Sequence, residues 1–305
     1  MSRTPPESLS LEAPPRALLA ARLADLLELT KPRITFMVVL TTAVGFILPA
    51  TGPLPLGLFF HALLATGALV SGASVLNQVL EIDTDARMRR TAQRPLPSGR
   101  MHPDAALALG VALSIAGVLW LALAVNLLTA LVGIAALVGY VFVYTPMKRW
   151  TSLATIVGAV PGALPPVMGW TAYRDAIEPG AWVLFGILFL WQHPHFLAIA
   201  WMCREDYGRA GFPMLSVRDD GGVRTARQAL LWSAALVPVA LLPSVLGLTG
   251  GVYFAGALAA GLLYVAGAVA FARKRAHETA KKLLWISVLY LPAILAVMLL
   301  DRVTL

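Results

Sequence analysis

Long apolar stretches, each close to the length needed to cross a bilayer, follow one another through most of this chain. A transmembrane helix needs about 20 consecutive apolar residues. We read nine such spans, near residues 33–50, 58–80, 104–125, 127–145, 153–172, 181–202, 228–247, 251–272 and 283–300. The chain is 58% hydrophobic and only 13% charged, whereas soluble domains carry about 25% charged residues. The sequence therefore predicts an all-α polytopic membrane protein with nine transmembrane helices.

The net charge of +8 would fit a nucleic-acid partner, but the distribution of the basic residues argues against one. With nine spans, the N-terminus and every second loop share one side of the membrane, and 22 of the 24 Lys and Arg residues lie there. Arg174 and Arg302 lie on the other side. Because cytoplasmic loops collect Lys and Arg, we expect a multi-pass protein of the cell (inner) membrane, with its N-terminus in the cytoplasm and its C-terminus outside.

Residues 1–30 are polar and contain several prolines. They lack the apolar core and small-residue cleavage site of a signal peptide. We therefore expect a disordered cytoplasmic tail, followed by one intramembrane domain over residues 31–305. The single cysteine, Cys203, cannot form an intramolecular disulfide, and no Cys/His cluster has the spacing of a zinc site.

Two cytoplasmic loops, residues 81–103 and 203–227, are long and rich in charge, and each follows a span that ends in polar residues. They stand four spans apart, which suggests two four-helix halves plus a ninth helix. Parallel repeats of this kind place a site between the halves. Residues 158–170, GAVPGALPPVMGW, hold three prolines among glycines. Such a segment either faces a cavity or forms a helix contact built on small residues.

The first charged loop carries the strongest signal of a functional site. Asn77, Glu81 and Asp85 recur every fourth residue, so on a helix they line one side. Oxygen ligands on one face suit a hard cation such as Mg²⁺, and carboxylates emerging from a membrane helix are costly to place there. Five arginines follow at once, namely Arg87, Arg89, Arg90, Arg94 and Arg100. Acidic residues for a metal beside basic residues predict a binding site for a metal diphosphate.

Two further motifs are candidates for the same anion. In the second loop, Glu205 and Asp206 are flanked by arginines. They either face the first loop and bracket a diphosphate through Mg²⁺, or form an ordinary interfacial charge cluster. In YTPMKRW, residues 144–150, Lys148 and Arg149 either follow the preference for basic cytoplasmic loops or neutralise a departing diphosphate.

A histidine pair marks the sixth span. WQHPHF, residues 191–196, places His193 and His195 inside this span or near its end. Intramembrane histidine is uncommon and by default indicates a functional site. The two side chains either hydrogen-bond within the bundle or contact a polar or metal-bearing substrate such as a porphyrin, since imidazole is a common iron ligand.

Taken together, these motifs resemble those of the UbiA superfamily of intramembrane prenyltransferases, and within it the branch of protoheme IX farnesyltransferases (heme O synthases). The resemblance covers roughly residues 28–300. It rests on LTKPRIT (29–35), Asn77-x3-Glu81-x3-Asp85, RTAQRPLPSGR (90–100), YTPMKRWT (144–151), PGALPPVMGW (161–170), WQHPHF (191–196) and REDYGRAGFPML (204–215). The last two motifs are similar to the heme branch rather than the quinone branch.

The resemblance implies nine transmembrane helices around a central cavity. It implies that farnesyl diphosphate alkylates the 2-vinyl group of heme B and that water adds, which gives heme O for the cofactor of heme-copper oxidases. A downstream heme A synthase is then a candidate partner. The implied site has Mg²⁺ as cofactor on Asn77, Glu81 and Asp85, the diphosphate near Arg90, Arg94, Lys148 and Arg149, and the heme near His193 and His195.

The sequence departs from the superfamily pattern in two places. Position 81 is Glu where many members have Asp, and Arg209 and Ala210 stand where a repeat of the second acidic motif needs acidic residues. We therefore do not expect a full second metal site.

Two rival functions remain open. A prenyltransferase for a quinone precursor or chlorophyllide is the nearest, and the histidine pair is the feature that separates it from the heme branch. A transporter with repeated halves is less consistent with the sequence, because the acidic residues cluster at the membrane edge rather than at the midplane.

Overall fold

The computed structural model describes residues 15–303, which are almost entirely helical, with one isolated antiparallel bridge between Thr249 and Arg302. The elements in chain order are α1 (Pro15–Thr30), α2 (Pro32–Ile47), α3 (Leu56–Leu80), α4 (Ile82–Ala86), α5 (Pro103–Ala124), α6 (Leu127–Val138), the π-helix η1 (Gly139–Tyr144), α7 (Thr145–Met147), α8 (Ala154–Ala163), α9 (Pro165–Arg174), α10 (Pro179–Met202), α11 (Arg204–Arg209), α12 (Val223–Val245), α13 (Gly251–Lys274) and α14 (His277–Leu300).

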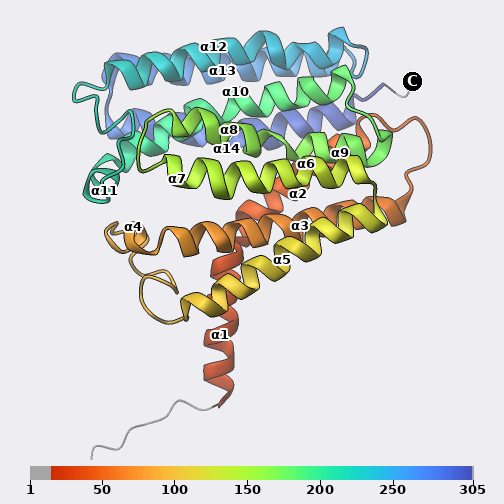
Figure 1. Ribbon diagram of the computed structural model, residues 1–305. Helices are drawn as coiled ribbons and strands as arrows, with labels where there is room; N and C mark the ends of the chain where they lie inside the picture. The colour runs from red at the N-terminus through yellow and green to blue at the C-terminus, as the bar shows by residue number, and fades with distance from the viewer. Residues whose placement is uncertain (1–14, 304–305) are drawn as a thin grey trace, which may run out of the picture.

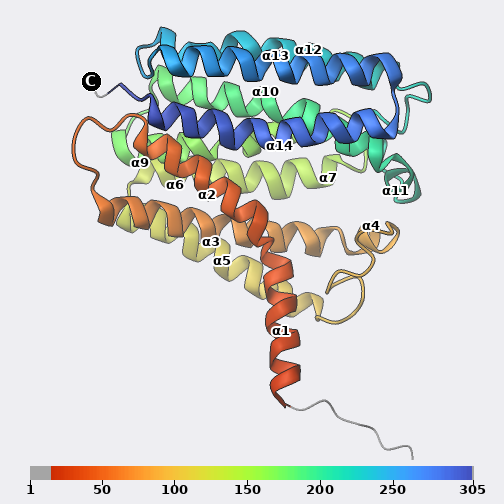
Figure 2. The same cartoon turned by 180° about the vertical axis from the view of Figure 1, so that it is seen from behind.

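The long helices lie side by side in one bundle, whereas α1 leaves the bundle at a steep angle (Figures 1 and 2). Among the described residues, seven helical segments are long and apolar enough to cross a membrane. They are α3, α5, the continuous segment Leu127–Met147, α10, α12, α13 and α14. The chain is therefore an integral membrane protein of the all-α class, as the sequence predicts.

Two of the nine predicted spans are not single long helices. The span predicted at 33–50 is α2, which has 16 residues. The span predicted at 153–172 is divided into α8 and α9, of ten residues each. Pro165 and Pro166 open α9, and proline has no backbone N–H with which to continue the preceding helix. The helix therefore breaks at this point.

The N-terminal segment also differs from expectation. Residues Pro15–Thr30 form α1, so the disorder expected for residues 1–30 does not extend to this half of the segment. Residues 1–14 lie outside the described part of the chain. The structure of α1 is explained by its sequence, because alanine and leucine, both strong helix formers, dominate it.

The proline- and glycine-rich segment at 158–170 packs closely against neighbouring helices. A Cβ atom on Gly169 of α9 would overlap the Thr42 carbonyl oxygen of α2, and one on Gly45 would overlap the Pro166 carbonyl oxygen. Residues 165–172 of α9 are all buried. Small residues let the two backbones approach. Of the two readings left open for this segment, the helix contact applies to its second half.

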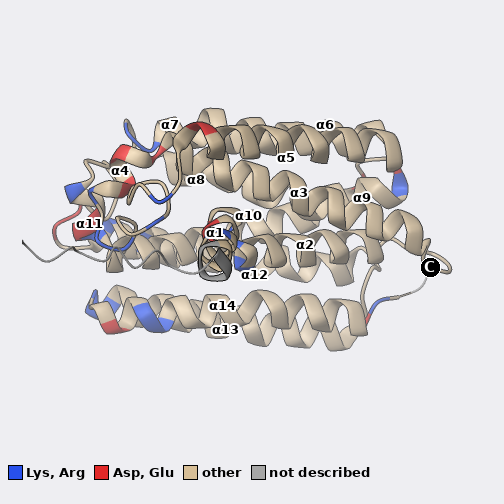
Figure 3. Ribbon diagram, turned by 90° about the horizontal axis from the view of Figure 1, so that it is seen from below, with Lys and Arg blue, Asp and Glu red and all other residues tan. Residues whose placement is uncertain are grey.

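Charged residues gather at one end of the bundle, the end that carries α4, α7 and α11, and are sparse at the end near the C-terminus (Figure 3). The two long charged loops, which contain α4 and α11, therefore lie at the same end. The main core of the bundle is made of apolar side chains, most of them from α9, α10, α12, α13 and α14, with others from α2, α3, α5, α6 and α8.

Candidate active site

The three residues of the predicted metal motif lie where α3 passes into α4. Glu81 joins the two helices, and the backbone N–H of Asp85 donates to the Glu81 carbonyl at 2.7 Å. The helical path thus continues across the joint. The exposed fractions of Asn77, Glu81 and Asp85 are 2%, 6% and 1%. Because a buried carboxylate without a partner is very costly, the groups that face these side chains determine what the site can do.

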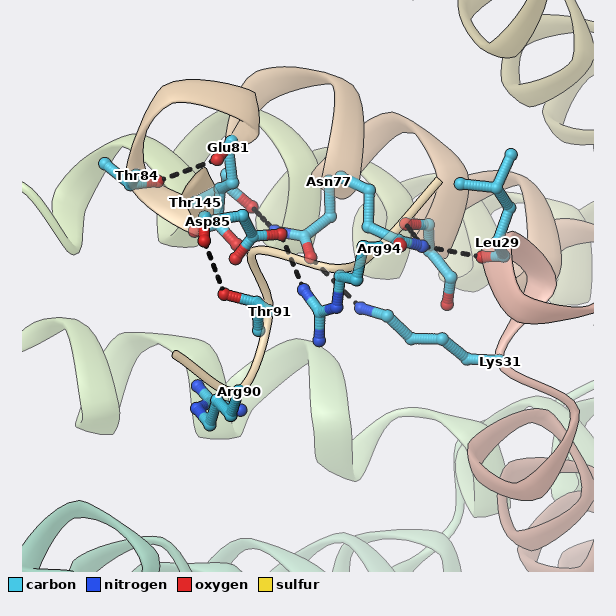
Figure 4. A network of polar contacts seen from close by, with 12 residues as sticks. Leu29, Lys31, Asn77, Glu81, Thr84, Asp85, Arg90, Thr91, Arg94 and Thr145 are labelled. Carbon is cyan, nitrogen blue, oxygen red and sulfur yellow. Dashed lines mark hydrogen bonds and ion pairs between the residues drawn. The ribbon is translucent and has the colours of Figure 1, made fainter. Parts of the chain in front are cut away.

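Each buried carboxylate is paired with a cation, and Figure 4 shows the pair of Asp85 with Arg94. Lys148 Nζ lies 2.8 Å from Glu81 Oε1, and Arg94 Nη1 lies 2.6 Å from Asp85 Oδ2. Lys148 comes from the segment after α7, so its ion pair joins two distant parts of the chain. Burial by itself lowers the pKa of Lys148, but the Glu81 carboxylate and Tyr144 beside it outweigh this effect and hold the pKa above its ordinary value.

Asn77 lies beside the ion pairs and is held from two directions (Figure 4). Its Nδ2 donates to Thr145 Oγ1 at 3.0 Å, and its Oδ1 accepts from Lys31 Nζ at 3.3 Å. Thr145 in turn donates to the Tyr140 carbonyl at 2.8 Å. The amide oxygen of Asn77 therefore points toward a cation, which is the atom and the orientation that a metal ligand would need.

Lys31 lies in this cluster as well, although the sequence analysis gave it no site role and contained it only within the LTKPRIT motif. It stands between α1 and α2 with φ 48° and ψ 60°, a left-handed conformation that is strained for a residue with a side chain. Burial, with repulsion from Arg94 and Lys148, lowers the pKa of Lys31 to about 7. Its place in the KPR sequence at the start of a span was the available signal.

The π-helix η1 precedes the residues that reach Asn77 and Glu81. A π-turn is an insertion into an α-helix and is often found at functional sites. Thr145 follows η1 directly, and Lys148 lies one turn later with its Nζ 4.5 Å from the centre of the Tyr144 ring. The apolar pattern of residues 127–145 gave no indication of this change in helix type.

Two other predicted diphosphate ligands have different partners. Arg149 is exposed and donates to the Leu80 carbonyl at 2.7 Å, at the end of α3. Arg90 lies apart from the cluster in Figure 4 and donates to Tyr207 Oη at 3.2 Å, with its guanidinium carbon 5.3 Å from the centre of that ring. The structure thus brings Arg94 and Lys148 to the acidic residues, but neither Arg90 nor Arg149.

The second acidic loop contacts the first loop without joining the cluster. Asp206 Oδ1 accepts from the backbone N–H of Arg89 at 3.3 Å and pairs with Arg209, while Glu205 is exposed. An apolar cluster of Met88, Ala210, Phe212 and Met214 joins the two loops. The loops therefore pack on each other over the charged end of the bundle.

His193 and His195 lie on α10 but point to different neighbours. His193 stacks on Trp232 with ring centres 4.1 Å apart, and its Nδ1 lies 2.6 Å from the Phe189 carbonyl oxygen. Its Nε2 is buried and has no hydrogen-bond partner in the described part of the chain. His195 Nδ1 lies 2.8 Å from Ser287 Oγ. Ser287 thus satisfies one nitrogen of His195, whereas the buried Nε2 of His193 has no such partner in this part of the chain.

The donor set of the site fits a hard cation that arrives together with an anion. Its oxygen donors are two carboxylates and one amide, the ligand type that Mg²⁺ prefers. Within residues 15–303, no group of three or more His, Cys, Asp or Glu side chains could hold a metal. Lys148 and Arg94 already balance the two carboxylates, so a bare cation would add excess positive charge. An anion that takes over Lys148 and Arg94 would free Glu81 and Asp85 for a metal.

Comparison with known proteins adds to this geometry. The family model for the UbiA prenyltransferase family matches residues 38–291. A protoheme IX farnesyltransferase of Solibacter usitatus is 48% identical over 287 residues, which is 91% of this chain and 98% of the relative. One of Opitutus terrae is 42% identical over 285 residues, 92% of this chain and 96% of the relative.

The fold has solved counterparts as well. The structure of a UbiA homolog from Archaeoglobus fulgidus bound to GPP and Mg²⁺ superposes with a TM-score of 0.66 at 19% identity, over 90% of this chain and 99% of the homolog. At that identity the likeness concerns the fold of the two chains.

Proposed function

Because this chain belongs to the UbiA prenyltransferase family, we propose that it transfers a farnesyl group from farnesyl diphosphate to protoheme IX (heme B) and so makes heme O. The two relatives described above carry the name of that activity and match this chain over nearly their whole length. The observation in the structure that supports the proposal is the buried cluster of Asn77, Glu81 and Asp85 with Lys31, Arg94 and Lys148. Such a cluster is suited to a metal diphosphate.

The diphosphate end of the substrate would bind where the cations now pair with carboxylates. Asn77, Glu81 and Asp85 would hold Mg²⁺, whose charge helps to neutralise the diphosphate. Arg94, Lys148 and Lys31 would then turn to the phosphate oxygens. We propose these three as the main diphosphate ligands. Arg90 and Arg149, also expected from the sequence, would have to leave Tyr207 and the Leu80 carbonyl first.

In the reaction the bond between the first farnesyl carbon and the bridging oxygen breaks, and the electron pair leaves with the diphosphate. Positive charge develops on the allylic carbon, and the π-electrons of the 2-vinyl group of heme form the new carbon–carbon bond to it. Water adds its oxygen to the other vinyl carbon, and the released proton accompanies the diphosphate. Arg94, Lys148 and Lys31 favour the step by stabilising the charge of the leaving group. A site that limits water protects the allylic cation until the bond forms.

The finer architecture that we propose has nine crossings around a central cavity. The short helix α2 and the broken pair α8 and α9 would add two crossings to the seven long segments. The protein would lie in the inner membrane with its charged end facing the cytoplasm, because basic loops remain on that side.

Glu205 and Asp206 would serve chiefly to hold the second loop over the site. The heme O that is formed would pass to a heme A synthase.

We propose that the heme lies near His193 and His195 on α10, with His193 as the closer contact, because its Nε2 is buried and has no hydrogen-bond partner within residues 15–303. We expect His193→Ala to raise KM for heme B roughly 10-fold, the effect of losing one good polar contact of about 1.4 kcal/mol. Ser287→Ala removes the partner of His195 and leaves His193 intact. It should therefore raise KM for heme B by less than about 3-fold, which is half of the His193→Ala effect in free energy. Equal effects of the two variants would contradict the assignment.

Mass spectrometry of the hemes formed by the purified protein in lipid tests the proposed function. With heme B, farnesyl diphosphate and Mg²⁺, we expect a product heavier than heme B by one farnesyl group and one hydroxyl group. Omitting either substrate should abolish the product. Prenylation of a quinone precursor or chlorophyllide, with heme B left unchanged, would instead support the rival enzyme. A protein that makes no prenylated product from any of these acceptors would favour the transporter reading.

A further inference from the structure

The helix α1 has an unusual position for part of a membrane protein. It projects from the bundle steeply in both side views, and the view from below looks along its axis while the long helices lie across the view (Figures 1, 2 and 3). Residues 19–24 are exposed, whereas Leu29 near its end is fully buried. Since the long helices cross the membrane, α1 extends roughly within the membrane plane.

One face of α1 is an exposed leucine stripe. Leu19, Leu23 and Leu27 follow at intervals of four residues, so they lie on the same side of the helix. Their side chains are 60%, 52% and 59% exposed. An exposed row of large apolar side chains indicates a partner that removes it from water.

The opposite face of α1 is attached to the charged end of the bundle. Arg100 Nε lies 2.9 Å from Asp25 Oδ1, and Arg100 Nη2 lies 3.2 Å from Glu28 Oε2. At 100° per residue, the centre of the Asp25–Glu28 face is about 170° from the centre of the leucine stripe. Arg100 belongs to the first charged loop, so these ion pairs turn the acidic face toward the cytoplasmic end and the leucines toward the apolar part of the bundle.

The leucine stripe also continues an apolar surface of the membrane-spanning helices. Ile34 and Phe36 at the start of α2 are 56% and 65% exposed, and Phe60 and Leu64 of α3 are 55% and 57% exposed. A shallow groove of about 500 Å³ lies between α2, α3 and α5, and Thr30, the last residue of α1, lines it. Exposed apolar side chains of spanning helices face lipid tails, so the same medium borders the groove and α1.

From these observations we propose that α1 is an interfacial helix, whose leucine stripe inserts into the cytoplasmic leaflet of the lipid bilayer. Interfacial helices lie in the membrane plane with their apolar face among the acyl chains. The inference is independent of the substrate of the enzyme. It also links the bilayer to the site. The Leu29 carbonyl near the end of α1 accepts from Gln78 Nε2 at 2.8 Å, and Lys31 directly follows α1.

A depth measurement on the full-length protein tests this placement. In a Cys203→Ser background, single cysteines replace Leu19, Leu23 or Leu27, and Ala21→Cys is the control, because Ala21 is exposed on the acidic side of the same helix. Each cysteine carries an environment-sensitive fluorophore, and the protein is reconstituted in vesicles of phosphatidylethanolamine and phosphatidylglycerol. We expect lipid-borne nitroxides to quench the three stripe labels several-fold more than the Ala21 label, and aqueous iodide to quench them several-fold less.

Two outcomes would overturn the proposal. Equal iodide quenching at all four positions in the folded protein, checked by its unfolding temperature, would place the leucine stripe in water. Shielding from iodide that disappears when the protein is diluted 10-fold in lipid would assign the stripe to a second copy of the chain. Nitroxide quenching that persists on dilution is the result that a bilayer contact requires.

Discussion

At the scale of single residues, the site is a set of buried charges that satisfy one another in the absence of substrate. Removing one member of a buried ion pair costs about 3–5 kcal/mol, because the other charge is left without a partner. Glu81 with Lys148 is the more buried of the two pairs, with side-chain exposures of 7% and 12%. The cations that stabilise the free protein are therefore the same ones that we assign to the diphosphate.

Replacing Asp85 with Asn tests the metal role while keeping the shape of the side chain. We expect kcat to fall about 100-fold or more, because an amide is a much poorer Mg²⁺ ligand than a carboxylate. The matched control is Asp83→Asn, an exposed carboxylate in the same short helix α4. The measurement is heme O formation at saturating farnesyl diphosphate over a range of Mg²⁺ concentrations. A control that loses as much activity as Asp85→Asn would contradict a specific metal site.

Lys31 allows a separate test of diphosphate binding. We expect Lys31→Met to raise KM for farnesyl diphosphate roughly 10- to 100-fold, since a hydrogen bond to a charged group is worth about 1.5–3 kcal/mol. Lys31→Arg should recover part of the affinity, because it restores the charge. The control is Arg33→Met, an exposed cation two residues away. If Arg33→Met has the same effect, the loss reflects the overall charge of the surface rather than a contact with the substrate.

The sequence predicted the arrangement of the three motif residues better than that of the cations around them. Spacing placed Asn77, Glu81 and Asp85 on one side of a helix, and they do lie together in the structure. The role of Lys31 depends on a left-handed turn between two helices, which side-chain spacing does not reveal. Arg149 and Lys148 are adjacent in sequence but have different partners, because neighbouring residues on a turn point in different directions.

At the scale of elements, glycines allow α2 and α9 to pack backbone against backbone, with no room for a Cβ at Gly169 or Gly45. We expect Gly169→Ala to lower stability by about 1–3 kcal/mol, because its new methyl group would overlap the Thr42 carbonyl oxygen. Gly57→Ala in α3 is the control, since a Cβ there meets no atom within 4 Å. Thermal unfolding in detergent, followed by size-exclusion chromatography, measures the difference. A Gly169→Ala protein as stable as the control would show that the helices can separate without cost.

Length and apolar composition were sufficient to predict the long helices, because few other structures satisfy the backbone within a membrane. The break at Leu164 was signalled by its prolines, but whether those residues face a cavity or a helix depends on distant partners such as Thr42. The helix α1 was missed because polar residues and prolines at 1–30 resemble a tail, while the ion pairs of Arg100 with Asp25 and Glu28 are long-range contacts.

At the scale of the whole molecule, the separation of charged and uncharged ends determines which way the protein should insert. We expect alkaline phosphatase fused after residue 303 to be active and a fluorescent protein fused there to be dark, because the C-terminus should be outside the cytoplasm. Truncated fusions after Gly221, in the second charged loop, should give the reverse pattern. Fluorescence at both positions would require an even number of crossings between them, and our nine-crossing proposal would then be wrong.

The π-helix η1 also constrains how the chain can change in length. A π-turn fits one residue more than an α-helical turn between the same two ends, and the backbone N–H of Thr145 accordingly donates to the Tyr140 carbonyl five residues earlier. Deleting one residue between Gly139 and Tyr144 would therefore allow this stretch to revert to an α-helix while Thr145 and Lys148 still face Asn77 and Glu81. Inserting a further residue would instead rotate everything beyond it by about 100° relative to α6. We expect a single-residue deletion here to be tolerated and a single-residue insertion to abolish heme O formation. In this part of the chain, the number of residues can fall by one without changing which side chains reach the site.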